Sequence, residues 1–153
     1  MTFSHDGDLH SEKNGSGDES MRFIQFWILP STRGLQTRVQ QQQHTLQDRT
    51  DRWLQIMGPA GEGGLDLAHD ARARVAHLTD AGRLEHTFAP GRGGYLYVID
   101  GRLSLNGDSR RTGDAVKVTG EGALEMSSSV AAELILIDVP LQFEPVGVWA
   151  GER

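Results

Sequence analysis

A series of closely spaced two-residue turns constrains the fold of this chain more than any other feature. Asp100-Gly101, Asn106-Gly107 and Gly113-Asp114 are dipeptides typical of tight turns, and they follow one another at short intervals. Before the first turn, residues 95–99 are aromatic, aliphatic and β-branched, which suits a half-buried pleated surface. Short strands at this spacing are typical of a β-sandwich or β-barrel, so we predict an all-β fold.

Two further stretches are predicted to be strands. Residues 71–78 vary with a period of two, which places Arg72 and Arg74 together on one face, and we interpret that face as solvated. Residues 132–139 form the most apolar run of the chain and end at Pro140, which cannot donate to a strand ladder. Because that run is nearly continuous, we expect both of its faces to be covered.

Length and composition exclude several classes of protein. A chain of 153 residues is long enough for one domain, or for one barrel with an appendage. The net charge is −6 without a basic cluster, so direct binding to nucleic acid is not expected. No apolar run is long enough to span a membrane, residues 1–20 lack the apolar core of a signal peptide, and cysteine is absent. We therefore expect a cytoplasmic protein.

The N-terminal region carries a family resemblance. Gly7, His10 and Asn14 follow the spacing at the end of a cupin motif, and the triplet His10-Ser11-Glu12 precedes the sequence RFIQFWILP. Together with the turn pattern of the later strands, these motifs resemble the pirin family, which consists of proteins with two cupin barrels. The resemblance implies a cupin jelly-roll barrel with an N-terminal remnant of a second cupin. It covers almost all of this chain but only about the second two-thirds of a typical family member.

The resemblance also implies a division of the chain. Residues 1–35 would be the remnant of the first, metal-binding cupin, and the glutamine-rich residues 36–52 would form a linker. Residues 53–144 would form the second barrel, which we expect to lack metal. Residues 145–153 would be a tail that crosses back to the first barrel.

His10 and Glu12 are the candidate metal ligands. In the pirin family the His and Glu of this triplet bind one iron-like ion, and residues two apart on a strand point to the same face. The implied cofactor is one divalent transition metal, Fe or alternatively Zn, Mn, Ni or Cu, or none. The other two ligands in the family come from a His-x-His pair ahead of the triplet, which this sequence lacks. Two protein ligands rarely hold a catalytic metal.

In the second barrel, the ligand positions of the family fall on residues that cannot bind a divalent ion. Aligned on the strand before Gly101, they are Thr87, Ala89, Gly94 and Leu124. Three histidines elsewhere in this region lie on separate predicted elements without carboxylates at ligand spacing. We interpret His69, His77 and His86 as surface or hydrogen-bonded side chains.

Three functions remain open. The first is a non-enzymatic binding or assembly module, or a truncated form. The second is an iron-dependent oxidoreductase similar to quercetin 2,3-dioxygenase, completed by another chain that supplies the missing His-x-His. The third is a small-molecule binder that uses the interior of the second barrel, with its mouth near Arg92, Tyr95 and Tyr97.

The predicted strand at residues 22–29 indicates self-association. Without the rest of the first barrel, it would expose apolar side chains along an unpaired edge: Phe23, Phe26, Trp27 and Ile28. Such an edge favours pairing with another chain. We expect a homodimer formed through the N-terminal strands.

Overall fold

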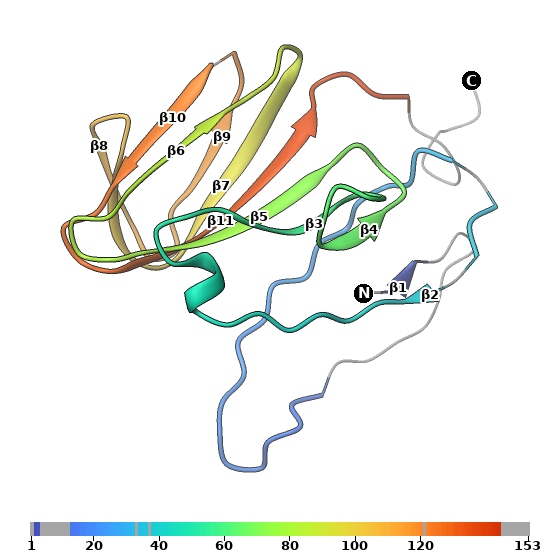
Figure 1. Ribbon diagram of the computed structural model, residues 1–153, viewed down its shortest axis with the longest axis horizontal. Coiled ribbons are helices and arrows are strands. Elements are labelled where there is room, and N and C mark those ends of the chain that lie inside the picture. Colours follow the sequence, from blue (N-terminus) through green and yellow to red (C-terminus); the bar gives the residue numbers. More distant parts are fainter. Residues whose placement is uncertain (1, 4–12, 33, 37, 121, 145–153) are drawn as a thin grey trace.

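The computed structural model describes residues 2–3, 13–32, 34–36, 38–120 and 122–144. The candidate ligands His10 and Glu12 and the tail of residues 145–153 lie outside the described residues. The elements are β1 (Thr2–Phe3), β2 (Arg38–Val39), the short 3-10 helix η1 (Gln47–Arg49), β3 (Leu54–Pro59), β4 (Leu65–Leu67), β5 (Arg72–Leu78), β6 (Arg83–Thr87), β7 (Arg92–Leu105), β8 (Asp108–Arg111), β9 (Ala115–Val118), β10 (Ala123–Ser127) and β11 (Ala132–Pro140). The fold is therefore all-β, as predicted (Figure 1).

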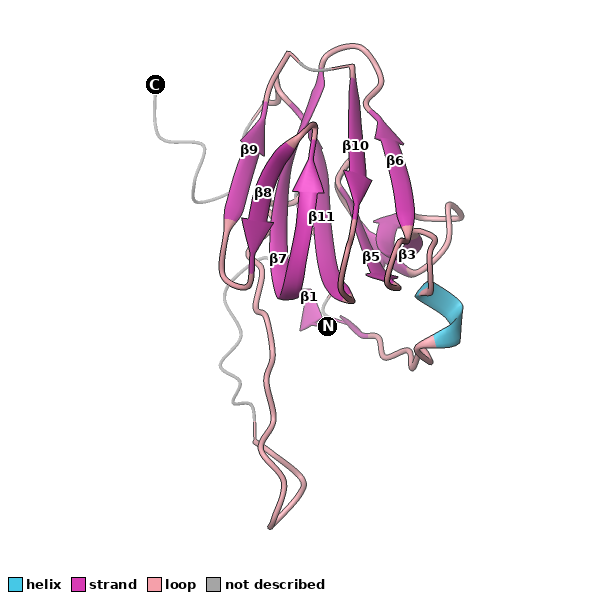
Figure 2. Ribbon diagram, turned by 90° about the vertical axis from the view of Figure 1, so that its left-hand side faces the viewer, coloured by secondary structure: helices cyan, strands magenta, loops and turns pink. Residues whose placement is uncertain are grey.

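The strands from β3 to β11 form one curled sheet with two layers. A large layer contains β4, β3, β5, β11, the first part of β7, and β9, and a small layer contains β6, β10, the last part of β7, and β8. Figure 2 looks onto the side on which β8, β10 and β6 lie. A separate two-stranded sheet pairs β1 with β2, and β2 lies inside the segment that was interpreted as a linker.

Strand β7 belongs to both layers. The sequence predicted a hairpin turn at Asp100-Gly101, but β7 continues through this dipeptide as one strand of 14 residues. Gly101 has a φ of 86°, and near it the ladder with β11 shifts register. Leu96 and Val98 face the core before this point, and Leu103 and Leu105 face it afterwards. The dipeptide therefore bends the strand from one layer into the other. Asn106-Gly107, in contrast, separates β7 from β8, as a hairpin turn should.

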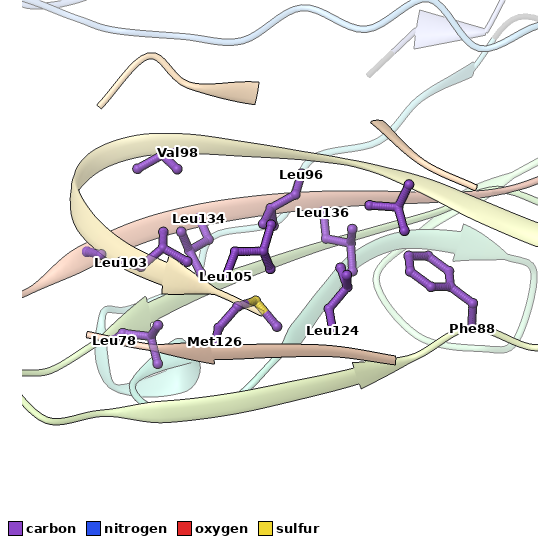
Figure 3. Close-up of a cluster of buried hydrophobic side chains, with 12 residues drawn as sticks. Leu78, Phe88, Leu96, Val98, Leu103, Leu105, Leu124, Met126, Leu134 and Leu136 are labelled. Carbon is purple, nitrogen blue, oxygen red and sulfur yellow. The ribbon is translucent and has the colours of Figure 1, made fainter. Parts of the chain in front are cut away.

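The main core fills the space between the two layers. Figure 3 shows side chains of β7 and β11 on one side and of β10 on the other, with Met126 and Leu124 facing Leu105 and Leu136. On β10 the buried residues alternate with exposed ones, so this strand buries one face. Leu134 and Leu136 are fully buried, and β11 is buried on both faces over most of its length. This confirms the expectation from its apolar sequence.

The outer face of the large layer is covered by the N-terminal segment. Phe26 and Ile28 pack against a second core cluster that includes Ala73 and Ile137. The segment is held at two ends, because Arg22 donates to Ile99 O at 2.9 Å and the Ser31 amide donates to Ala68 O at 2.8 Å. In Figure 1 this blue segment passes along the side of the large layer that faces away from β6 and β10.

The strand predicted at residues 22–29 is not formed. These residues have no regular secondary structure, although all of them are described. Side chains alternate all the same, because Phe26 and Ile28 are half-buried while Phe23 and Trp27 are exposed. The segment covers the sheet through side-chain packing and a few hydrogen bonds, not by joining its ladder.

Candidate functional site

Strand β6 points every second side chain into the barrel. Leu84 packs on the core, His86 and Phe88 are buried, and Thr87 and Ala89 are exposed. The sequence assigned the family His-x-His positions to Thr87 and Ala89, and these two residues are exposed. His86 and Phe88 are the pair that faces the interior, and Leu124 lies opposite His86 on β10. The imidazole of His86 therefore lies inside the barrel.

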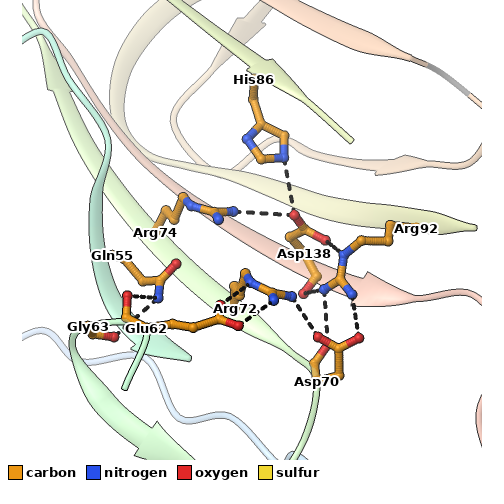
Figure 4. A network of polar contacts seen from close by, with 9 residues as sticks. All are labelled: Gln55, Glu62, Gly63, Asp70, Arg72, Arg74, His86, Arg92 and Asp138. Carbon is orange, nitrogen blue, oxygen red and sulfur yellow. Dashed lines mark hydrogen bonds and ion pairs between the residues drawn. The ribbon is translucent and has the colours of Figure 1, made fainter. Parts of the chain in front are cut away.

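Asp138 is the centre of the polar groups in the barrel. It lies on β11 between Ile137 and Val139, which face the outer cluster, so alternation directs its carboxylate inward. Arg92 Nε lies 2.6 Å from Asp138 Oδ1, and Arg74 Nη1 lies 3.3 Å from Oδ2. His86 Nε2 is also 3.3 Å from Oδ2, at ion-pair distance but without the geometry of a regular hydrogen bond. Figure 4 shows the side chains of Arg92, Arg74 and His86, which come from β7, β5 and β6, converging on Asp138.

The network continues toward the rim of the barrel. Arg92 also bonds Asp70, with 2.7 Å between Nη1 and Oδ2, and it donates to the backbone oxygens of Asp70 and Asp138. Arg72 bridges Asp70 and Glu62, at 2.6 Å and 2.8 Å. We name this set of residues the interior ion-pair network: Glu62, Asp70, Arg72, Arg74, His86, Arg92 and Asp138 (Figure 4).

The interpretation of Arg72 and Arg74 as a solvated sheet face was wrong. Their side chains are 19% and 20% exposed, and both are paired with carboxylates. The period of two was correct, but the face that carries these residues is the inner one. Both faces of β5 are covered, so an alternating sequence alone does not reveal which of its faces points into the barrel.

The environment lowers the pKa of two carboxyl groups in the network. Burial raises the pKa of Asp138, but the contacts with His86 and Arg92 outweigh burial, so its pKa lies below the ordinary value. Burial also raises the pKa of Asp70, but the bonds from Arg72 and Arg92 lower it by more, so its pKa also lies below the ordinary value. Both carboxylates are therefore charged at neutral pH and compensate the arginines.

These inward-facing residues do not fit a divalent metal ion. His86 and Asp138 are the possible donors near the family ligand positions, whereas Phe88 and Leu124 provide no donor atom. The Asp138 carboxylate is also held by Arg92 and Arg74, whose positive charges would oppose a cation at the same place. Among the described residues, no group of three or more His, Cys, Asp or Glu side chains could hold a metal.

The three histidines lie apart from one another. His69 packs edge-on against Phe143, with ring centroids 6.3 Å apart, and burial lowers its pKa. His77 Nδ1 lies 3.8 Å from a carboxylate oxygen of Glu133, and His86 contacts the interior ion-pair network. The proposed metal ligands His10 and Glu12 lie outside the described residues, so their geometry is not part of this site.

The predicted mouth of a ligand site is not assembled. Arg92 faces the interior, but Tyr95 and Tyr97 alternate with the buried Leu96 and Val98, which face the core. Tyr95 pairs with Ile137, whose side chain packs in the outer cluster, and cross-strand partners share a face. The two tyrosines therefore lie on the outer face of the large layer, and they do not line the barrel interior.

Sequence reasoning missed Asp138, although a signal was present. It is an isolated carboxylate within the strongest apolar run of the chain. A charged residue at such a position is rarely buried without a partner. Its partners come from strands 46 and 64 residues away in the sequence, so no local pattern identifies them.

Comparisons with known proteins agree on one family. Residues 55–139 match the family model of the quercetinase C-terminal cupin domain. A quercetin 2,3-dioxygenase of Escherichia coli K12 is 29% identical over 136 residues, which is 88% of this chain and 57% of that protein. The chain thus spans little more than half the length of this relative.

Solved structures show the same fold. The crystal structure of YhhW from Escherichia coli matches with a TM-score of 0.67 and 24% identity, over 79% of this chain and 49% of that one. The bacterial pirin YhhW in complex with nickel(II) matches with a TM-score of 0.65 and 23% identity, over 76% and 48%. Within the described residues, no helix is long and apolar enough to cross a membrane.

Proposed function

This chain belongs to the pirin-like cupins, through a barrel of the quercetinase C-terminal type, and from that premise we propose that it acts as a non-enzymatic binding or assembly module. The observation that supports the proposal is the interior ion-pair network. Asp138 is 4% exposed and is contacted by Arg74, His86 and Arg92 inside the barrel. In this proposal the polar interior of the barrel contributes to its stability, because its charged side chains are paired with one another.

An oxidoreductase completed by another chain is the second candidate. The pattern of His10 and Glu12 favours it, since these residue types are ligands of the metal in the first cupin of the pirin family. The match to a quercetin 2,3-dioxygenase over only 57% of that protein also favours it, because the remaining ligands would come from elsewhere. Such a complex would hold one divalent transition metal, with iron as the first candidate and nickel among the alternatives.

Metal content distinguishes the two functions. We would purify the protein without chelator and measure transition metals by elemental analysis, beside the variants His10→Ala and His44→Ala. His44→Ala is the matched control, because His44 lies outside the triplet. The proposed module gives metal content at background in all three proteins and no turnover of quercetin.

A different pattern would overturn the proposed module. Metal near one ion per chain that is lost in His10→Ala and kept in His44→Ala would assign a working site to the N-terminal triplet. Quercetin turnover by the same preparation would then make the chain part of a dioxygenase.

We also propose that the protein forms a homodimer through residues 22–29. Trp27 is 79% exposed and Phe23 is 58% exposed. Trp27 also lines an apolar groove of about 510 Å³ that is bounded by Ile137, Val139 and Phe143. A second copy of the same segment would cover this apolar surface, which is costly to leave in water.

A further inference from the structure

A second groove lies on the opposite side of the barrel, on the outer face of the small layer. It has a volume of about 450 Å³ and is located at the end of the layer where β6 begins and β10 ends. Its lining is polar, with two arginines and several serines: Asp80, Ala81, Arg83, Arg102, Leu103, Ser104, Gly107, Ser109, Ser127, Ser128 and Ser129. Neither the interior ion-pair network nor the N-terminal segment contributes to it.

The strand register aligns four of these residues in one row across the layer. Arg83 on β6 is opposite Ser127 on β10, Ser127 is opposite Ser104 on β7, and Ser104 is opposite Ser109 on β8. Directly opposed residues of neighbouring strands point to the same face. That face is the outer one, because the next residues along these strands, such as Met126 and Leu103, are buried in the core. The row is thus fixed by the backbone of the sheet.

The polar groups of the row, and Arg102 beside it, are available for a ligand. Within the described part of the chain, neither Arg83 nor Arg102 forms an ion pair, and the hydroxyls of Ser104, Ser109 and Ser127 form no hydrogen bond with protein. By comparison, the arginines of the interior ion-pair network are each bound to at least one carboxylate.

Acidic groups limit which anions the groove can accept. Asp80 is part of the lining, and Glu85 and Glu125 form the neighbouring cross-strand pair on the same outer face. A highly charged polymer would meet these carboxylates, as well as the net charge of −6 on the whole chain. A compact ligand that fits between Arg83 and Arg102 would avoid most of this repulsion.

We propose that this groove binds a small molecule that carries a phosphate group on a hydroxylated carbon skeleton. Guanidinium groups form paired, charge-assisted bonds with phosphate oxygens, and serine hydroxyls both donate and accept hydrogen bonds. The row of Ser104, Ser109 and Ser127 would face the hydroxyls of the skeleton while the arginines hold the phosphate. The volume lies within the usual range for small-molecule sites. This inference does not depend on the metal content or on the proposed function.

Ribose 5-phosphate, inorganic phosphate and ribose are suitable probes. We would titrate each into the 15N-labelled full chain and follow the backbone amide signals, together with calorimetry. Saturable shifts with ribose 5-phosphate, centred on residues 102–109 and 127–129, are expected. Binding of ribose 5-phosphate should be at least about tenfold tighter than binding of phosphate or ribose, because each of these probes lacks one half of the contacts.

Arginine variants distinguish binding of ribose 5-phosphate in the groove from general attraction of an anion to positive charge. Arg83→Gln and Arg102→Gln should each weaken binding of ribose 5-phosphate by about tenfold, a typical loss for one charged hydrogen-bonding partner. Arg52→Gln is the matched control, because Arg52 is exposed and does not line the groove, and its removal changes the net charge equally. Circular dichroism and thermal melting would check that the variants fold.

Three results would overturn the proposal. One is the absence of saturable shifts with ribose 5-phosphate in the well-folded wild-type chain. Another is equal weakening by all three variants, which would show that the anion responds only to overall charge. Equal affinity for phosphate and ribose 5-phosphate would also reject a site for the hydroxylated skeleton.

Discussion

At the scale of single residues, Asp138 is the carboxylate on which the charged side chains inside the barrel converge. Its carboxylate is 5% exposed and lies within 3.3 Å of nitrogen atoms from Arg74, His86 and Arg92. Charges removed from water in this way are tolerated only when they are paired. The network therefore depends on one negative charge at its centre.

Replacing Asp138 by asparagine should destabilise the fold by about 3 kcal/mol, because the buried guanidinium groups of Arg92 and Arg74 lose their counter-charge. Unfolding in urea, followed by tryptophan fluorescence, measures this difference. Asp108→Asn is the control, since Asp108 is 74% exposed in its pair with Arg110 and should change stability by less than about 1 kcal/mol. Equal effects of the two substitutions would contradict the central role of Asp138.

The stability gap between wild type and Asp138→Asn should depend on pH only in acid. The pKa of Asp138 is lowered by folding, so its contribution is complete above the ordinary carboxyl pKa of about 3.9 and is lost as pH falls through the lowered value. Urea unfolding at a series of pH values should give a constant gap from about pH 7 to pH 5 and a shrinking gap below about pH 4. A gap that changes between pH 7 and pH 5 would contradict this account.

The sequence did not predict which side chains of this region face the interior of the barrel. The sequence placed ligand positions at Thr87 and Ala89, which are exposed, and on a strand a shift by one residue reverses the face. His86 was interpreted as a surface or hydrogen-bonded residue, and it is buried beside Asp138. The orientation of these side chains follows only from the ladder that pairs Leu124 with His86.

At the scale of elements, the bend of β7 determines how the two layers join. Gly101 has a φ of 86°, a value that residues with a Cβ atom rarely adopt. A Cβ atom at this position would also overlap the carbonyl oxygen of Ala131. Gly101 is therefore required both by its backbone conformation and by the close approach of the chain before β11.

Gly101→Ala should lower the free energy of unfolding by about 3 kcal/mol. This loss combines the strain of a positive φ with the displacement of the backbone near Ala131. Gly107→Ala is a matched control, because Gly107 has a φ of 88° but no atom lies within 4 Å of an added Cβ. We expect about 1 kcal/mol for this control, from strain alone. Thermal unfolding of both variants measures the difference, and equal losses would reject the role of crowding at the bend.

The sequence predicted several strands but did not predict that β7 continues through Asp100-Gly101. Residues 71–78 and 132–139 were predicted as strands, and β5 and β11 agree with these predictions within one residue at each end. The dipeptide Asp100-Gly101 has the composition of a hairpin turn, and that composition specifies a positive φ but not a reversal of direction. Residues 22–29 have the composition of a strand, but they are not hydrogen-bonded into a sheet ladder.

At the scale of the whole molecule, the N-terminal segment leaves apolar surface on the outside of the large layer. Phe26 and Ile28 face the sheet, while Phe23 and Trp27 face away from it. Side chains of this kind on a protein surface commonly mark an interface. This arrangement supports the proposed homodimer, because the same segment would contribute the contacts from both copies.

Association should therefore depend on Trp27 and Phe23. We expect the wild-type chain to sediment as a dimer and the variant Phe23→Ser/Trp27→Ser as a monomer of unchanged fold. Leu46→Ser is the control, because Leu46 is 49% exposed but lies on another segment, beside η1. Analytical ultracentrifugation distinguishes these states. A wild-type monomer, or a dimer that persists in the double variant, would exclude this interface.

The passage of β7 through both layers also determines how the barrel comes apart. β8, β9, β10 and β11 all hydrogen-bond to this single strand. A break or a local opening within residues 92–105 would thus remove partners from strands on both sides of the core at once. We therefore expect the two layers of the barrel to unfold together in one transition.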